Sequence, residues 1–525
     1  MVNAGSAQLE HAAPLPVWIR WAFGVGAIGE LVYLGMFNTF IGIYYNQAVG
    51  LSNSLIGTAV LLALIGDAIS DPAVGILSDR HNSRFGRRHP FLFLAPLPLA
   101  TALWCIFNPP DGLTDPQSLA SSQGQTALFV WLAFWTILSR ICLTLYLIPH
   151  LALGGEIVRD PQERSRLFSL NSVFGYATGA LFAFIAWSVF LAGESVTASG
   201  ESVPNHLIAS SYLPLSLFAG ALVFISIFLC ALGTFSRVPY LSKPASDLGK
   251  LNLLTFIKKI LSTLKNRNYL FLLVGLFFFT VSTSLFETFN VFINTYFWEL
   301  APEDIRWLSL AMVPGIVCGA LLSPRLMHTY DRRPVLLAAV IGMTLFAQLP
   351  VDLRLLGLFP GNTSTVLLPS LLTNAFFLAL SLGIGTVAVL AMLADIIDEN
   401  ELVTGLREEG LFYSARTFFS KMAGSVGHFA AGILLDVFVK MPFDAVPGEV
   451  DADIIVRLGM AAGPIMGLSA ALAAIFYSQY GLTKKQHEKV MAELATSPST
   501  PGTPIIGGDK GRQELTPGCN QRPAP

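Results

Sequence analysis

Two aspartates stand four residues apart in an otherwise apolar stretch, in the run Gly66-Asp67-Ala-Ile-Ser-Asp71-Pro72. In a helix this spacing puts both carboxylates on one face, about one turn apart. Two like charges this close repel, so one carboxyl group binds a proton unless a cation lies beside the pair. We therefore predict that Asp67 and Asp71 bind a coupling cation, which is either Na⁺ or a proton. The alternative is that Asp71 has only a structural role, as a residue that bends the helix at its cytoplasmic end before Pro72.

A second polar group, Arg416, Thr417 and Lys421, lies in a later apolar stretch. Thr417 and Lys421 share a helix face, and Arg416 lies beside it. A lysine at membrane depth needs an acidic partner. The acids that could serve are Asp67, Asp71 and Glu30. The functional interpretation is a coupling role for Lys421, in which the cation displaces it from the carboxylates. A static bridge that pins two parts of the molecule together is the alternative.

A third polar group, Glu287, Asn290 and Asn294, follows helical spacing of three and four residues. On one face, these side chains suggest a wet cavity that hydrogen-bonds a hydroxylated solute. Contacts between helices would explain them about as well. Weaker candidates for the same cavity are Glu30, Thr144 and Asn374. Arg140 is expected to lie in a buried pair or an interface, without a clear role. Three histidines are interpreted as structural: His150, His328 and His428.

Helices must position these residues, and the composition indicates that lipid surrounds those helices. Of 525 residues, 53% are hydrophobic and only 13% are charged, and the mean hydropathy is +0.61. Such a surface is too apolar for water. A helix of about 20 apolar residues spans the hydrocarbon core. We predict twelve such helices, at 18–46, 54–78, 91–108, 126–150, 168–193, 212–235, 268–298, 305–328, 335–351, 366–394, 411–439 and 455–480.

Several functional classes are not supported by the sequence. A net charge of −2 gives no nucleic-acid footprint. The five cysteines are scattered, and no Cys/His cluster suggests a disulfide or a metal site beyond the possible Na⁺ site. No nucleophile–base pair occurs at membrane depth, so we expect neither an enzyme nor a cofactor. The first 17 residues do not form a signal peptide, so the first helix is expected to direct insertion.

The distribution of basic residues predicts the topology. Lys and Arg gather in the loops after even-numbered helices, whereas the loops 109–125 and 194–211 contain none. The positive-inside rule then places both termini in the cytoplasm. A weak repeat between the loops after the second and eighth helices indicates two pseudo-symmetric six-helix bundles, the major facilitator fold. The expected parts are a cytoplasmic segment 1–17, bundles 18–235 and 268–480, a cytoplasmic linker 236–267 and a disordered cytoplasmic tail 481–525.

The loop after the second helix carries the most specific motif, which runs from Asp79 to Pro90. Its basic residues could pair with the acidic run after the tenth helix and close a cytoplasmic gate. The residues assigned to this gate are Asp79, Arg84, Arg87, Arg88, Asp395 and Asp398, with Glu399, Glu401, Glu408 and Glu409 as further acids. A static topology anchor is the other interpretation.

Three separated blocks resemble the glycoside–pentoside–hexuronide:cation symporter family, to which melibiose permease belongs, within the major facilitator superfamily. They are Gly66-Asp67-Ala-Ile-Ser-Asp71-Pro72 with Arg84-Phe-Gly86-Arg87-Arg88; Ile148-Pro149 through Glu156 to Arg166; and Ala394-Asp395 through Gly410 and Tyr413 to Lys421. The resemblance implies that Asp67, Asp71 and Thr144 contribute the Na⁺, Li⁺ or H⁺ site. It also implies that Thr417 and Lys421 lie at the sugar and cation sites.

The sugar-contacting positions depart from those of melibiose-type members. This chain has Leu147, Leu151 and Ser172 where those members carry an aspartate, a tryptophan and an arginine. It also has Arg416 in place of a glutamine, which would suit an anionic solute such as a hexuronide. The coupling residues therefore look retained, while the galactoside site does not. Similar loops or acid pairs occur in sucrose:proton symporters and in sodium-dependent lysophosphatidylcholine transporters.

The sequence thus predicts a secondary active symporter of the cell membrane, working as a monomer by alternating access. Its partners would be a monovalent cation and a small solute, most simply a sugar, glycoside or uronide. A cation-coupled transporter of lysolipids or other amphipaths is the second choice. A non-transporting assembly or sensor protein on the same fold is the alternative from another class.

Overall fold

The computed structural model describes residues 15–81, 83–158, 160–196, 202–241, 262–405 and 408–496. Twelve of the described helical segments are long and apolar enough to cross a membrane, as predicted. They are α2 (Val17–Ile43) with η1 (Tyr44–Val49), α3 (Asn53–Arg80), α4 (His89–Leu94) with α5 (Pro96–Ile106), α8 (Ser122–Ile157), α9 (Pro161–Ile185) with η2 (Ala186–Phe190), α10 (Tyr212–Phe235), α12 (Arg267–Phe292) with η6 (Ile293–Phe297), α13 (Pro302–Thr329), α14 (Arg332–Leu355), α15 (Leu367–Thr404), α16 (Glu409–Ile433) with η7 (Leu434–Val439), and α17 (Ala452–Met460) with η8 (Ala461–Ile465) and α18 (Met466–Ser478).

Short elements connect the spans. The described ones are α6 (Asp111–Thr114), α7 (Pro116–Leu119), the antiparallel pair β1 (Glu194–Val196) and β2 (Ser202–Pro204), and the 3₁₀ turns η3 (Asn205–Leu207), η4 (Ala209–Ser211) and η5 (Val238–Tyr240). Most of the predicted linker 236–267 and of the segment 1–17 lies outside the described residues.

The predicted disordered tail 481–525 needs a correction at its start, because Lys484–Thr496 forms the helix α19. A capping box explains where this helix begins. The Gln486 side chain accepts hydrogen bonds from the Thr483 backbone and hydroxyl, at 2.8 and 2.9 Å, which is the reciprocal arrangement that satisfies helix-end donors. Residues 497–525 lie outside the described part of the chain.

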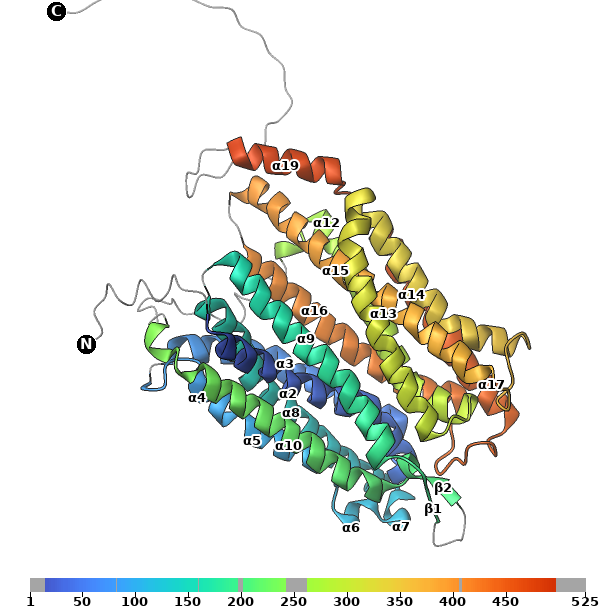
Figure 1. The fold of residues 1–525 in the computed structure, drawn as a ribbon. Helices are drawn as coiled ribbons and strands as arrows, with labels where there is room; N and C mark the ends of the chain where they lie inside the picture. Colours follow the sequence, from blue (N-terminus) through green and yellow to red (C-terminus); the bar gives the residue numbers. More distant parts are fainter. Residues whose placement is uncertain are drawn as a thin grey trace, which may run out of the picture.

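The spans pack as two bundles (Figure 1). In the first half α2 packs against α9 and α10, and α3 packs against α8. In the second half α12 packs against α16 and α18, while α15 packs against α13 and α14. The helix pairs that join the halves include α3 with α16, α2 with α12 and α9 with α13. This is the two-bundle arrangement that the sequence predicts. The end of the bundles that carries the loops after α3, α8, α10 and α13 is called the basic end below, and the other is called the far end.

Side chains tie the two halves together at the far end. The Asp436 carboxylate, on η7, accepts hydrogen bonds from the Ser52 hydroxyl at 2.6 Å, the Asn53 backbone at 3.1 Å and side chain at 3.0 Å, and the Ser54 backbone at 2.7 Å. An acid of one half thus caps the N-terminus of α3 in the other half, where backbone N–H groups and the helix dipole favour negative charge. Two glycines, Gly57 and Gly432, allow α3 and α16 to touch here, since a Cβ on Gly432 would lie within 2.3 Å of the Asn53 carbonyl oxygen.

Further polar contacts close the far end. The Gln47 side chain donates to the Pro442 carbonyl at 3.0 Å and accepts from the Tyr296 hydroxyl at 2.9 Å. Close by, His206 hydrogen-bonds Thr295 at 3.0 Å. Burial lowers the pKa of His206 to about 3. The imidazole therefore stays neutral at physiological pH, so this contact does not respond to pH in that range.

Candidate ion and solute site

Two acids and two bases form a cluster where α3 meets α8 and α16. Arg140 on α8 donates to Asp67 Oδ2 through Nη2 at 2.5 Å and through Nε at 3.1 Å. Lys421 on α16 lies 2.6 Å from Asp71 Oδ2 and 3.8 Å from Asp67 Oδ1. The Thr144 hydroxyl donates to Asp71 Oδ1 at 2.8 Å. We call Asp67, Asp71, Arg140 and Lys421 the charge cluster.

The charge cluster is balanced, because two carboxylates face one guanidinium and one ammonium group. Its members differ in exposure. The side chain of Asp67 is 3% exposed, whereas that of Asp71 is 26% exposed and that of Lys421 is 20% exposed. Arg140 and Asp67 thus form the inner pair, and Asp71 and Lys421 form the outer pair. Because Lys421 belongs to the second half, the outer pair links the two bundles across the α3–α16 contact.

The structure brings together most of the predicted ion site. Asp67, Asp71 and Thr144 meet as the sequence predicts, and Lys421 reaches both acids. Glu30, on α2, lies within electrostatic range of Lys421. Arg140 lies in a buried pair, as the sequence predicts, but the sequence does not assign it to this site. The signal was available, because Arg140 and Thr144 stand four residues apart and so repeat the spacing of the two aspartates they face.

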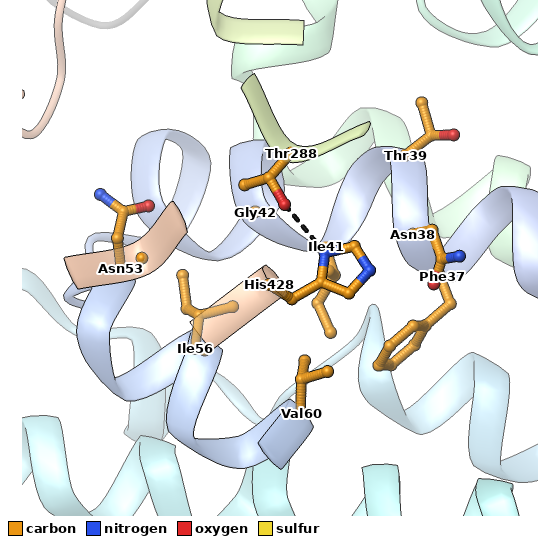
Figure 2. A pocket seen from close by; sticks show the side chains of 12 residues that line it. Phe37, Asn38, Thr39, Ile41, Gly42, Asn53, Ile56, Val60, Thr288 and His428 are labelled. Atoms are coloured by element: carbon orange, nitrogen blue, oxygen red, sulfur yellow. Dashed lines mark hydrogen bonds between the residues drawn. The ribbon is translucent and has the colours of Figure 1, made fainter. Parts of the chain in front are cut away.

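A second polar cluster crosses the interface on the far-end side of the charge cluster, and Figure 2 shows Asn38, Thr288 and His428 of this cluster. His428 on α16 hydrogen-bonds the Thr288 hydroxyl on α12 through Nδ1 at 2.8 Å, and its Nε2 lies 3.7 Å from Glu287 Oε2. Asn38 on α2 donates to the same Glu287 oxygen at 3.3 Å. This set, which we call the interface cluster, lies beside a small pocket lined by both halves, among whose residues are Asn38, Thr288 and His428. Its side chains offer both hydrogen-bond donors and hydrogen-bond acceptors, which is the combination that a hydroxyl group needs to form all its hydrogen bonds.

The interface cluster includes one predicted solute residue, Glu287. Asn38 and Thr288 are not singled out by the sequence. His428 had been interpreted as structural, and its bond to Thr288 is compatible with that. The Arg140 charge also acts on His428, so the two clusters are neighbours. Asn38 lacks any distinguishing sequence pattern, because a lone asparagine in an apolar stretch is usually a packing residue.

The other predicted solute residues are spread more widely. Thr417 is exposed, and its hydroxyl donates to the Tyr413 carbonyl of its own helix at 3.0 Å. Asn294 is buried in η6 and donates to Asn290 at 3.3 Å. The Asn374 amide donates to the Phe346 carbonyl at 2.7 Å and so joins α15 to α14.

Arg416 lies away from the charge cluster. It lines a pocket inside the second bundle with residues of α12, α14, α15 and α18, Tyr477 among them. Five residues along a helix turn the side chain by about 140°, which explains why Arg416 faces away from Lys421. Its role in selecting an anionic solute stays a prediction that this placement does not favour.

The predicted gate residues pair within their own halves. In the first half, Arg87 and Arg88 both bind Glu156, at 2.9 and 2.8 Å, and Arg88 also reaches Asp79 at 2.5 Å. Arg84 stacks on the neighbouring Phe85 ring at 4.8 Å. In the second half, Asp395 pairs with Arg332 on α14, and His487 on α19 contacts Asp395 at 3.4 Å and Asp398 at 3.0 Å. A pairing of Arg88 with Asp395 or Asp398 stays a prediction for another conformation.

Replacing Glu156 with glutamine should lower the stability of the protein markedly. Glu156 neutralises two arginines, and Arg88 is 6% exposed. Removing one partner of a buried ion pair leaves an uncompensated charge, a loss of about 3 kcal/mol. We expect a thermal midpoint several degrees lower in detergent. As a control, Asp111→Asn neutralises an exposed carboxylate and should leave the thermal midpoint unchanged. An equal midpoint for both variants would contradict the role of Glu156.

Comparisons with known proteins show the family and the fold of the chain. A model of the family described as MFS/sugar transport protein matches residues 22–484. The putative glycoside/cation symporter YagG of Escherichia coli is 24% identical over 91% of this chain and 94% of its own. The glucuronide carrier protein homolog of the same organism is 24% identical over 90% of this chain and 94% of its own. The inward-open structure of the xylose transporter XylE from E. coli superimposes with a TM-score of 0.55, at 15% identity, over 91% of this chain and 98% of that one.

The family match spans nearly the whole chain, and the similar structure has the same fold. The family transports solutes and does not catalyse reactions, so the prediction that the chain is not an enzyme is confirmed. The twelve spans identify a multi-pass membrane protein. The chain therefore belongs to the MFS/sugar transport protein family, the sugar:cation symporters of the major facilitator superfamily.

Proposed function

We propose that this protein carries a sugar, glycoside or uronide across the cell membrane together with a monovalent cation. The observation that carries the proposal is the charge cluster. Four ionisable side chains at membrane depth are expensive to keep there. They lie where the two bundles touch, and the outer pair is the one that crosses between them. A cation that changes this pair therefore changes the contact between the halves.

The mechanism follows from the exposure of the outer pair. When Lys421 holds Asp71, the halves are tied together at that point. A cation bound at Asp71 competes with Lys421 and releases α16 from α3, so ion binding and bundle position become linked. Thermodynamic linkage then requires that cation and solute strengthen each other's binding by the same factor.

The interface cluster supplies the solute site in this proposal. The cluster combines Asn38 of the first half with Glu287 and His428 of the second. A solute bound among them would therefore contact both bundles. Sugar hydroxyl groups donate and accept hydrogen bonds, as these side chains do. The names of the relatives, which mention a glycoside and a glucuronide, support the same class of solute.

The orientation is part of the proposal. The basic end faces the cytoplasm by the positive-inside rule, which places both termini inside. The far-end contacts of Asp436 and Gln47 then close the outer side, so this conformation opens inward. One chain holds both clusters, so we propose that a monomer suffices for transport.

Uptake by purified protein in proteoliposomes tests the proposal. Labelled glycosides, uronides and lysolipids are offered in turn, with a Na⁺ gradient or a pH gradient imposed. We expect gradient-driven accumulation of a glycoside or a uronide. Accumulation of a lysolipid alone would replace the sugar class, and no accumulation of any solute under either gradient would contradict symport.

The Glu287→Gln variant tests where the solute binds. Loss of a charged hydrogen-bond acceptor reduces binding by about 1.5–3 kcal/mol, which corresponds to about 10- to 100-fold in affinity. We expect the solute concentration for half-maximal uptake to rise by that factor. Glu194→Gln makes the same change on the exposed strand β1 and should leave uptake unaltered. Equal affinities in both variants would place the solute elsewhere.

A further inference from the structure

The donor set around the paired aspartates does not suit a sodium ion. Asp67 Oδ2 accepts from two Arg140 nitrogens, at 2.5 and 3.1 Å, while Asp67 Oδ1 faces Lys421. Asp71 Oδ1 accepts from Thr144, and Asp71 Oδ2 accepts from Lys421. All four carboxylate oxygens therefore already face a protein donor. A metal ion needs several free oxygen lone pairs around it, and this set offers few.

Charge requires one resident base to leave the cluster before any added cation can bind, and the next question is which base leaves. Adding Na⁺ to the charge cluster would put three positive charges against two negative ones at membrane depth. Unbalanced charge there is strongly unfavourable. One of the two resident bases would have to leave or lose its charge before a metal ion could bind.

Arg140 is not suited to leave. Its side chain is 17% exposed, and it binds a carboxylate that is 3% exposed through two nitrogens. A guanidinium group does not give up its proton in proteins. Breaking the pair would leave Asp67 buried and unpaired, a large penalty. Arg140 therefore occupies permanently the side of Asp67 where a metal ion would bind.

Lys421 differs in each respect. It has a flexible stem, is 20% exposed and sits on the other bundle. When it withdraws, the Thr144 hydroxyl remains as the hydrogen-bond donor to Asp71 among the described residues. The other charged and titratable groups around this place include Arg140 on α8, Asp67 on α3, Glu30 and Tyr33 on α2 and His428 on α16. Arg140 and Asp67 neutralise each other, so the carboxylate left without a counter-charge is Asp71.

We propose that Arg140 acts as a built-in cation that excludes Na⁺ from the paired aspartates, so that the coupling ion is a proton carried by Asp71. The inference rests on the proposed symport and narrows it to one ion. The proton forms an O–H bond at Asp71 as Lys421 withdraws. It is released when Lys421 returns, and Lys421 keeps its charge throughout.

Sodium binding to the purified protein tests the inference without any solute. Thermal unfolding is followed in detergent while NaCl replaces choline chloride at constant ionic strength and pH. A ligand that binds only the folded state raises the midpoint. The wild type should show no Na⁺-specific shift up to about 100 mM, a concentration at which a millimolar site would raise the midpoint by several degrees. A saturable Na⁺-specific rise in the wild type would overturn the inference.

Variants at Arg140 decide whether this residue causes the exclusion. Arg140→Gln removes the resident charge, and we expect a saturable Na⁺-specific rise of several degrees. Arg140→Lys keeps a positive charge and should remain insensitive to Na⁺. If Arg140→Gln is folded and still ignores Na⁺, Arg140 is not the excluding residue. If Arg140→Gln does not fold, a Na⁺ response in Arg140→Lys would contradict the charge argument, and its absence would support it.

The driving ion is then measured in proteoliposomes that hold wild-type protein. We expect solute uptake with a pH gradient alone and none with a Na⁺ gradient alone at equal pH. Uptake driven only by Na⁺ would overturn the proton assignment while leaving symport intact. Absence of uptake under both gradients would contradict the proposed function instead, and the sodium-binding result would still stand.

Discussion

An Asp71→Asn variant should lose ion-driven accumulation by at least about 100-fold while still binding and exchanging solute. Asparagine keeps the size of the side chain and its hydrogen bond with Thr144, but it neither attracts Lys421 as an ion pair nor binds a coupling cation. The inner pair of Arg140 and Asp67 is untouched. The chain should therefore fold and carry solute down its gradient. The factor of 100 corresponds to about 2.7 kcal/mol of lost coupling.

Accumulation ratios and exchange rates in proteoliposomes separate the two activities of this variant. Lys421→Gln, made on Asp71→Asn, removes the unpaired base and should recover stability without recovering accumulation, since both partners of the pair are then neutral. Asp111→Asn is the matched control, because it makes the same substitution at an exposed site remote from the cluster. Wild-type accumulation in Asp71→Asn would remove Asp71 from the coupling mechanism.

A Gly432→Ala variant should open the far end. The added Cβ would lie 2.3 Å from the Asn53 carbonyl oxygen, a distance that real Cβ atoms do not reach. Backbone must move apart, and Asp436 four residues later would lose its hydrogen bonds to Ser52 and Ser54. Charged hydrogen bonds contribute about 1.5–3 kcal/mol each. The balance between the two conformations should shift toward the one with an open far end by at least 10-fold.

Reaction of one introduced cysteine reports this shift. Ile56 lines the pocket beneath the far-end contacts and is 5% exposed. In a background without the four described cysteines and Cys519, Ile56→Cys should react with a water-soluble maleimide at least 10-fold faster when Gly432→Ala is present. Gly75→Ala is the control, because its Cβ would meet nothing within 4 Å. Equal reaction rates in the two glycine variants would show that the far-end contact does not gate access.

The charge cluster could be predicted from the sequence because burying an unpaired charge costs a large free energy. Two acids on one helix face demand counter-charges, and Lys421 demands an acid. A charge at membrane depth needs an opposite charge in any packing of the helices. The pairing of Lys421 with Asp67 and Asp71 could therefore be predicted from residue type and depth. The twelve spans were predictable for a similar reason, since a minimum length of apolar helix is needed to cross a bilayer.

The other contacts of the candidate site depend on how the helices pack, which the sequence does not give. Which side of α8 faces α3 determines that Arg140 meets Asp67, and the sequence gives only the matching four-residue spacing as a hint. Arg416 was placed beside Lys421 because the two are close in sequence, yet helix rotation carries it into the second bundle. The interface cluster depends on three helices from two halves, and no local pattern in the sequence brings Asn38, Glu287 and His428 together.

The central claim is that solute movement carries charge through Asp71. Electrical recording from proteoliposomes adsorbed on a solid-supported membrane, during a rapid jump in the concentration of an uncharged glycoside that the uptake assay shows to be carried, measures this charge directly. An uncharged solute is needed because an anionic uronide that moves with one proton carries no net charge. We expect a transient current of positive charge moving with the solute in wild-type protein, and none in Asp71→Asn protein that still binds the solute. Currents of equal size in both proteins, or solute uptake by the wild type without any current, would contradict it.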